Sequence, residues 1–166
     1  MTDSVLYAEQ DKIALITINR PERLNTLTAE VISRVAECVD QATFSDEVAA
    51  IVLRGAGPNV SAGYDLVDFL ANNDGSDGPI WDPVRDYQSM SANVRSFMKV
   101  WECPKPVVAE ISGWAIGGAT DLLLCADLLF MADDAQIGYA PSRIYGTPTT
   151  MMWIHRIGLE HAKQFL

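Results

Sequence analysis

The sequence predicts an α/β fold built from βαβ units, and two stretches of the chain support this prediction. Residues 13–19 have strand composition, residues 28–42 carry apolar residues at helical spacing, and residues 48–53 are apolar throughout. Residues 105–127 read KPVVAEISGWAIGGATDLLLCAD, where an apolar strand precedes a glycine pair and a leucine-rich helix. A strand, a helix and a second strand form one βαβ unit, whose crossover is right-handed in almost all proteins.

Length and composition are those of one globular domain, which we expect to cover residues 1–166. Apolar residues make up 49% and charged residues 20% of the 166, which argues against disorder. The formal net charge is −10. So acidic a chain is a poor binder of nucleic acid or of an anionic membrane, because its overall field repels them. An anionic ligand therefore has to be held by local groups.

The cysteines and the N-terminus indicate the compartment. Cys38, Cys103 and Cys125 are odd in number and widely spaced, without the pairing of a metal site, which is typical of free thiols in a reducing compartment. The first residues, MTDSVLYAEQDK, have neither the basic nor the apolar region of a signal peptide. No apolar run reaches 18 residues, so we expect no membrane span and a cytoplasmic protein.

The first half of the chain predicts two strands, a helix and a third strand. A turn at residues 10–12 separates strands at 5–9 and 13–19, and Thr28 is placed to cap the helix. The strand at 48–53 lacks polar residues, so we expect it to be buried on both faces. A short helix is expected at 64–69. Residues 72–83 (NNDGSDGPIWDP) are rich in turn formers and acids and predict a flexible, solvated loop without the regular spacing of a metal site.

The second half predicts a helix at 84–100, strands at 107–111 and 128–131, and a short extended piece at 136–138. Thr147 and Pro148 are expected to begin a final helix that runs to residue 157, since proline is favoured at the first helical position. Gly158 would end that helix, and another would begin at Glu160. The sequence stops within this apolar helix, so we expect either a truncated C-terminal region or a partner subunit that covers it.

The glycine pair Gly117-Gly118 predicts an anion site. Glycines at the start of a helix leave backbone N–H groups free, with the positive end of the helix dipole behind them. Such a place suits an anion that is bound or that forms during a reaction. Asp121 follows one helical turn later. An acid so close to an anion site needs either a chemical role or a partner.

Three separated blocks carry a resemblance to a known family. Residues 19–27 (NRPERLNTL), residues 55–66 (GAGPNVSAGYDL) and residues 105–127 resemble, in order and spacing, three motifs of the crotonase superfamily, also called the enoyl-CoA hydratase/isomerase family. The corresponding family patterns are N-R-P-x-x-x-N-x-L, G-x-G-x-x-F-S-A-G-x-D-L and K-P-V-V-A-x-V-x-G-x-A-x-G-G-G-x-x-L-x-x-x-C-D. The resemblance covers nearly the whole chain and leaves out the C-terminal helices that members usually carry.

The resemblance implies a spiral of βαβ turns that binds an acyl-CoA thioester. It implies an oxyanion hole formed by the backbone N–H groups of Tyr64 and Gly118, which hold the thioester oxygen as it becomes an enolate. It implies no cofactor and no metal, because coenzyme A enters as part of the substrate, and it implies trimers or dimers of trimers. The other residues implied to contact the CoA thioester are Arg23, Leu24, Ala62, Asp65, Leu66 and Gly117.

The sequence departs from the family at the positions of the two proton-transferring glutamates. The two glutamates of the hydratases fall on Asp121 and on either Pro141 or Ser142, and the third glycine of the helix start is Ala119. The enolate-stabilising groups are therefore present, whereas at most one of the two acids is. Nearby candidates for the missing acid are Tyr139, Ser142, Arg143 and Tyr145.

We therefore expect an enzyme of the enoyl-CoA hydratase/isomerase type with Asp121 as its single acid or base. Two alternatives stay open: other enolate chemistry (decarboxylation, C–C hydrolysis or dehalogenation), and an acyl-CoA binder without turnover. Each candidate residue also has a structural interpretation. Asp121 can be hydrogen-bonded to neighbouring backbone, Asp65 can cap a helix, and Arg23 can be an ordinary surface arginine.

Overall fold

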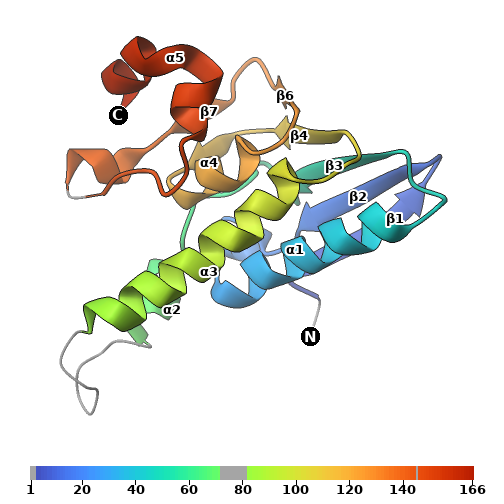
Figure 1. The fold of residues 1–166 in the computed structure, drawn as a ribbon, viewed down its shortest axis with the longest axis horizontal. Coiled ribbons are helices and arrows are strands. Elements are labelled where there is room, and N and C mark those ends of the chain that lie inside the picture. The colour runs from blue at the N-terminus through green and yellow to red at the C-terminus, as the bar shows by residue number, and fades with distance from the viewer. Residues whose placement is uncertain (1–2, 72–81, 145) are drawn as a thin grey trace.

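The computed structural model describes residues 3–71, 82–144 and 146–166. Of the loop predicted at residues 72–83, residues 72–81 lie outside the described residues, as does Tyr145. The described chain forms a five-stranded sheet with helices against one face and a smaller helical region at the C-terminal end (Figure 1).

The sheet has the strand order β1-β2-β3-β4-β6. Its strands are β1 (Val5–Gln10), β2 (Ile13–Ile18), β3 (Ala50–Gly55), β4 (Val107–Ile111) and β6 (Leu128–Met131). β1 and β2 form an antiparallel hairpin, and the remaining neighbours are parallel, with Ile16 opposite Leu53 and Leu53 opposite Ala109. The predicted α/β class and the first βαβ unit, β2-α1-β3, are therefore confirmed.

Two long helices, α1 (Ala29–Phe44) and α3 (Pro83–Trp101), lie next to each other against the sheet (Figure 1). Thr28 caps α1 as predicted, because its side-chain oxygen accepts a hydrogen bond from the Val31 N–H at 3.2 Å. Asp82 caps α3 in the same way through the Val84 N–H. The inward residues of the helices and strands form one core, which includes the fully buried Phe97.

The opposite face of the sheet is only partly covered. Ile51 and Leu53 are buried, but Val52 is half-buried and Arg54 reaches the surface. The expectation that this strand is buried on both faces is therefore wrong, because the described helices cover a single face.

A second, two-stranded parallel sheet pairs β5 (Trp114–Ile116) with β7 (Gln136–Gly138). The helix α4 (Gly118–Leu123) follows β5 directly, and all six of its residues are buried. No local pattern in the sequence predicted β5. Its three residues become a strand only through pairing with β7, about twenty positions later in the chain.

The C-terminal region differs from its prediction. Helix α5 (Met152–Phe165) begins four residues later than the expected start at Pro148, and its N-cap Met151 makes no side-chain cap hydrogen bond. The Thr149 and Thr150 N–H groups instead bind the Asp121 side chain, which holds this segment out of the helix. Gly158 breaks the helix with φ 78°, as predicted.

Three short elements complete the fold: the 3-10 helices η1 (Pro21–Arg23) and η2 (Ala140–Arg143), and α2 (Leu66–Ala71). Within the described ranges, no helix is both long and apolar enough to cross a membrane.

Candidate functional site

Two chain segments meet beside the start of α4. Ser61 pairs with β5: its N–H donates to the Trp114 carbonyl at 3.0 Å, and its carbonyl accepts from the Ile116 N–H at 3.1 Å. Gly63 lies very close to the backbone between β5 and α4. A Cβ added to Gly63 would stand 2.5 Å from the Ile116 carbonyl oxygen and 3.4 Å from the Gly118 nitrogen. With φ 91° besides, this position requires glycine, and the close approach brings Tyr64 next to Gly118.

The backbone N–H groups of Tyr64 and Gly118 are free. Neither donates to a protein acceptor in the part of the chain that the structure describes, whereas the N–H of Gly117 donates to the Gly138 carbonyl at 2.9 Å. Two neighbouring unpaired donors on fixed backbone suit an oxygen atom that gains negative charge. The structure thus brings together the two groups that the sequence predicted for an oxyanion hole.

The Tyr64 ring packs on Gly118. A Cβ added to Gly118 would stand 2.4 Å from Cε2 and 2.7 Å from Cδ2 of that ring. Glycine at 118 therefore allows both the free N–H and the ring position.

Asp121 is fully buried in α4, and its carboxylate is enclosed by donors. Oδ2 accepts from the Thr149 N–H at 3.2 Å, and Oδ1 accepts from the Thr150 N–H at 3.1 Å and the Thr150 hydroxyl at 3.0 Å. Burial raises the pKa of Asp121, although these hydrogen bonds oppose the rise. The carboxylate ties α4 to the segment before α5, which is the structural role foreseen for it. Its raised pKa also fits a group that exchanges protons.

The Tyr64 hydroxyl points into the same buried region. Burial and the Asp121 charge raise the pKa of Tyr64 to about 12. Thr149 and Asn93 are its polar neighbours, but neither meets hydrogen-bond geometry with it. The hydroxyl is therefore buried without a hydrogen-bond partner in the described chain.

The position of the second family glutamate lies in η2, beside the glycine pair. A Cβ on Gly117 would stand 3.8 Å from the Pro141 ring. The Ser142 hydroxyl donates to the Tyr139 carbonyl, and the Tyr139 hydroxyl donates to the Thr147 carbonyl, both at 2.8 Å. Arg143 is exposed. Among these candidates for the missing acid, Tyr139 and Ser142 thus already bind backbone.

The residues predicted to contact CoA lie together at the surface where η1 meets α2. Leu24 accepts the Ala62 N–H at 3.0 Å, and its side chain, like that of Leu66, is exposed. Arg23 bonds to Asp65 at 3.1 Å and keeps 44% of its side chain exposed, so part of its guanidinium faces solvent.

Asp65 is instead enclosed, with 2% of its side chain exposed. It accepts hydrogen bonds from the Thr26 hydroxyl at 2.8 Å and the Asp68 N–H at 3.1 Å. The second bond caps α2, which was the structural interpretation of Asp65 in the sequence. Burial raises the pKa of Asp65, but these bonds and two guanidinium groups outweigh it and hold that pKa well below its usual range.

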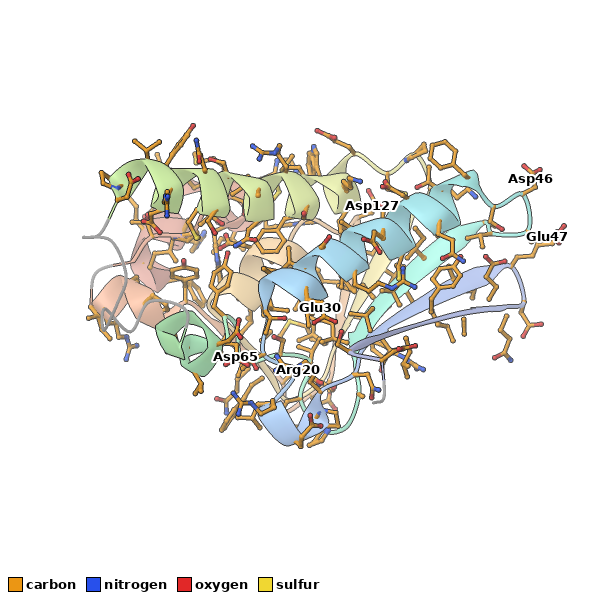
Figure 2. The ribbon with its side chains drawn as sticks, turned by 90° about the horizontal axis from the view of Figure 1, so that it is seen from below. Arg20, Glu30, Asp46, Glu47, Asp65 and Asp127 are labelled. Atoms are coloured by element: carbon orange, nitrogen blue, oxygen red, sulfur yellow. The ribbon has the colours of Figure 1, made fainter. Side chains whose placement is uncertain are left out.

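Sequence reasoning missed three residues that build this site. Arg20 forms the second ion pair with Asp65, at 3.1 Å (Figure 2). Asn25 is fully buried and donates to the carbonyls of Ala56 and Asn59, and the Ser61 hydroxyl donates to the Asn25 carbonyl. All three belong to the first two sequence blocks, but their contacts join residues 31 to 45 positions apart.

The described residues hold no cluster of three or more histidine, cysteine, aspartate or glutamate side chains that could bind a metal ion. Two free N–H groups lie at a glycine-rich helix start of an α/β fold. Such an arrangement can bind a carbonyl oxygen and stabilise negative charge on it. Comparisons with known proteins identify the family to which a site of this class belongs here.

Residues 8–166 match the family model described as "Enoyl-CoA hydratase/isomerase", and the chain belongs to this family. A crystal structure of an enoyl-CoA hydratase from Mycobacterium smegmatis superimposes with a TM-score of 0.88 and 37% identity, covering 98% of this chain and 58% of that one. The chain is 32% identical to the 1,2-epoxyphenylacetyl-CoA isomerase of Escherichia coli (strain K12), covering 87% of this chain and 53% of the relative. It is 31% identical to the mitochondrial Delta(3,5)-Delta(2,4)-dienoyl-CoA isomerase of Mus musculus, covering 76% and 39%.

The chain spans about 60% of the length of the first relatives that it matches.

Proposed function

We propose that this protein acts on acyl-CoA thioesters as an enzyme of the enoyl-CoA hydratase/isomerase type. One observation carries the proposal: the free N–H groups of Tyr64 and Gly118 lie on adjacent segments beside a glycine-rich helix start. In this proposal both donate to the thioester oxygen and stabilise the enolate that forms when a proton leaves C2 or when water adds at C3. In related chemistry, loss of one such donor costs roughly 3–4 kcal/mol of transition-state stabilisation.

The CoA moiety is proposed to lie along Arg23, Leu24, Ala62, Leu66 and Gly117. The exposed part of the Arg23 guanidinium provides local positive charge for a phosphate on a chain whose net charge is −10. Asp65 holds that guanidinium in place. We therefore assign Asp65 a positioning role rather than direct ligand contact.

Asp121 is proposed as the single proton-transferring group. Its pKa is raised by burial, and it lies within one helical turn of Gly118. Isomerisation needs one group that removes a proton from one carbon and returns it to another. Two of the relatives named above are isomerases, which agrees with this route.

An acyl-CoA binder without turnover is the second candidate function. It is favoured by the three hydrogen bonds that Asp121 already accepts and by its complete burial. Decarboxylation, C–C hydrolysis or dehalogenation would use the same enolate, and no feature of the described residues favours one of them.

Self-association and a reducing, cytoplasmic location are also proposed. The uncovered face of the sheet carries Phe130 and Leu128, which are 64% and 54% exposed. Parallel sheets in known proteins are usually covered on both faces, so a second copy of the chain is a natural cover. The three cysteines are free thiols, as a reducing compartment requires.

The test of activity is the loss of enoyl absorbance with crotonyl-CoA and longer 2-enoyl-CoA thioesters, in parallel with binding measured by calorimetry. Steady hydration that Asp121→Asn abolishes, with binding retained, would support the enzyme and its acid. Turnover unchanged in Asp121→Asn would leave this residue a structural role. Binding without hydration or isomerisation would favour the binder, and absence of acyl-CoA binding would overturn the proposal.

A further inference from the structure

The direction of the Gly118 N–H depends on the carbonyl group of the residue before it. A trans peptide group is planar, with its C=O and its N–H pointing to opposite sides. Any group that holds the Gly117 carbonyl therefore also orients the Gly118 N–H. The same relation holds at Tyr64, where the preceding Gly63 carbonyl accepts a hydrogen bond from the Leu27 N–H at 2.8 Å.

Thr120 holds the Gly117 carbonyl with two hydrogen bonds. The oxygen accepts the backbone N–H of Thr120 at 2.9 Å and its hydroxyl at 2.7 Å. Gly117 has a φ of 57°, and glycine populates more backbone conformations than other residues. The peptide group between Gly117 and Gly118 would therefore turn easily if its carbonyl were not held.

Trp153 of α5 extends this chain of hydrogen bonds. Its indole N–H donates to the Thr120 hydroxyl oxygen at 3.2 Å. Because an indole nitrogen can only donate, the single proton of the hydroxyl stays directed at the Gly117 carbonyl. Thr120 is fully buried and Trp153 is 4% exposed, so water has little access to either bond. Hydrogen bonds linked in this way in a buried region strengthen one another.

We infer that Thr120 and Trp153 are positioning residues of the oxyanion hole. They fix the Gly117 peptide group and so orient the Gly118 N–H toward the thioester oxygen, and through them helix α5 supports the site. Their hydrogen bonds have partners within the protein, so neither residue needs to contact the substrate. The inference rests on the proposed function and adds two residues to that same site.

The test follows the infrared stretching band of the thioester carbonyl in bound crotonyl-CoA that carries ¹³C at that carbon, together with turnover. Thr120→Val keeps the shape of the side chain and removes the hydroxyl. We expect this variant to lose part of the wild-type shift to lower frequency and to turn over crotonyl-CoA about fivefold more slowly, the effect of one hydrogen bond. Thr120→Ser keeps a hydroxyl and should retain both the shift and the turnover.

Two further variants separate positioning from stability. Trp153→Phe removes the indole N–H and should lose a smaller part of the shift, but nothing further in a protein that already carries Thr120→Val, because it acts through that hydroxyl. Lys105→Met is the matched control. Lys105 donates to the Ala42 and Ser45 carbonyls at the end of α1, so its loss should lower the unfolding temperature without changing the carbonyl band.

A wild-type band and wild-type turnover in Thr120→Val would overturn this inference and leave the proposed function intact. Equal losses of the shift in Thr120→Val and Lys105→Met would assign Thr120 a structural role and also overturn it. Losses that add in the double variant would overturn the assignment of Trp153. If the wild type bound crotonyl-CoA without a shift, or did not bind it, the proposed function would fail together with this inference.

Discussion

Gly118 has room for a hydrogen atom and not for a methyl group on the side that faces Tyr64. The ring atom Cε2 would stand 2.4 Å from an added Cβ, so an alanine must push the aromatic ring away. The residue thus fixes two parts of the candidate site together: its own N–H and the place of the neighbouring phenol.

Gly118→Ala keeps the backbone N–H, but its Cβ displaces the Tyr64 ring and so disturbs the alignment of the two donors. It should leave the protein folded and lower turnover of a 2-enoyl-CoA by up to roughly 10²- to 10³-fold, the effect of losing one oxyanion donor. Steady-state kinetics checks the loss, and circular dichroism checks the fold. The matched control is Gly138→Ala, because an added Cβ at Gly138 meets no atom within 4 Å. Activity equal to wild type in Gly118→Ala would contradict the proposal that the reaction depends on the fixed arrangement of the Tyr64 and Gly118 N–H groups.

At the scale of elements, Asp65 joins η1 to α2. It pairs with Arg20 and Arg23 at 3.1 Å each, accepts from Thr26, and caps α2 through the Asp68 N–H. Figure 2 shows Asp65 and Arg20 next to each other at this junction. Because the carboxylate is almost fully buried, its removal leaves two cations and two donors without an acceptor.

Asp65→Asn should lower the free energy of unfolding at pH 7 by about 2–4 kcal/mol. The pKa of Asp65 is lowered on folding, so the unfolded state binds more protons in the range below its unfolded value near 3.8. The difference in the free energy of unfolding between the wild type and Asp65→Asn is therefore fully present above that pKa and shrinks as the pH falls below it. Urea unfolding between pH 7 and pH 2.5 measures the difference.

The control for this series is Asp46→Asn, an exposed acid in the connection between α1 and β3, which should change stability by less than about 0.5 kcal/mol. If the wild type remained more stable than Asp65→Asn by the same free energy down to pH 2.5, this would contradict a pKa of Asp65 that is lowered on folding.

Elements with local signals were predicted well from the sequence. The Thr28 cap, the period of α1, the strand at 107–111 and the break at Gly158 each depend on residues within one or two turns of themselves. The start of α5 was wrong and β5 was missed, because each depends on a distant partner. Asp121 takes the N–H groups of Thr149 and Thr150, and β7 supplies the pairing of β5.

The sequence located the residues of the candidate site, and it did not show the contacts that support them. The family blocks located Tyr64, Gly118 and Asp121, but no local pattern showed that Asp121 is enclosed by Thr149 and Thr150. Nor could the sequence show that the Tyr64 hydroxyl remains unpaired. These facts depend on contacts between segments that lie 28 to 85 residues apart.

For the molecule as a whole, the face of the sheet that the described helices leave uncovered carries exposed apolar side chains. Leu128 pairs with Val108 and Phe130 with Glu110, and exposed Leu6 lies on the same face. Arg54 forms the polar part of this face, with a 3.1 Å bond to the Thr17 hydroxyl and a 4.0 Å ion pair with Glu110.

The wild-type chain should therefore associate at concentrations of tens of micromolar, and Phe130→Lys should shift it toward monomer without lowering its unfolding temperature. Sedimentation velocity measures both states, with the exposed Phe44→Lys on α1 as the matched control. A wild type that is monomeric over this range, or association that Phe130→Lys does not weaken, would contradict the assignment of this face.

The most direct test of the oxyanion hole is the infrared spectrum of a bound 2-enoyl-CoA with ¹³C at the thioester carbonyl. Two backbone donors polarise the C=O bond, so we predict that its stretching band moves to lower frequency on binding. Most of this shift should disappear in Gly118→Ala, because the added Cβ displaces Tyr64 and misaligns the two donors. The measurement needs no turnover and is therefore independent of the missing acid. A ligand bound at saturation whose carbonyl band stayed at its position in water would contradict the account.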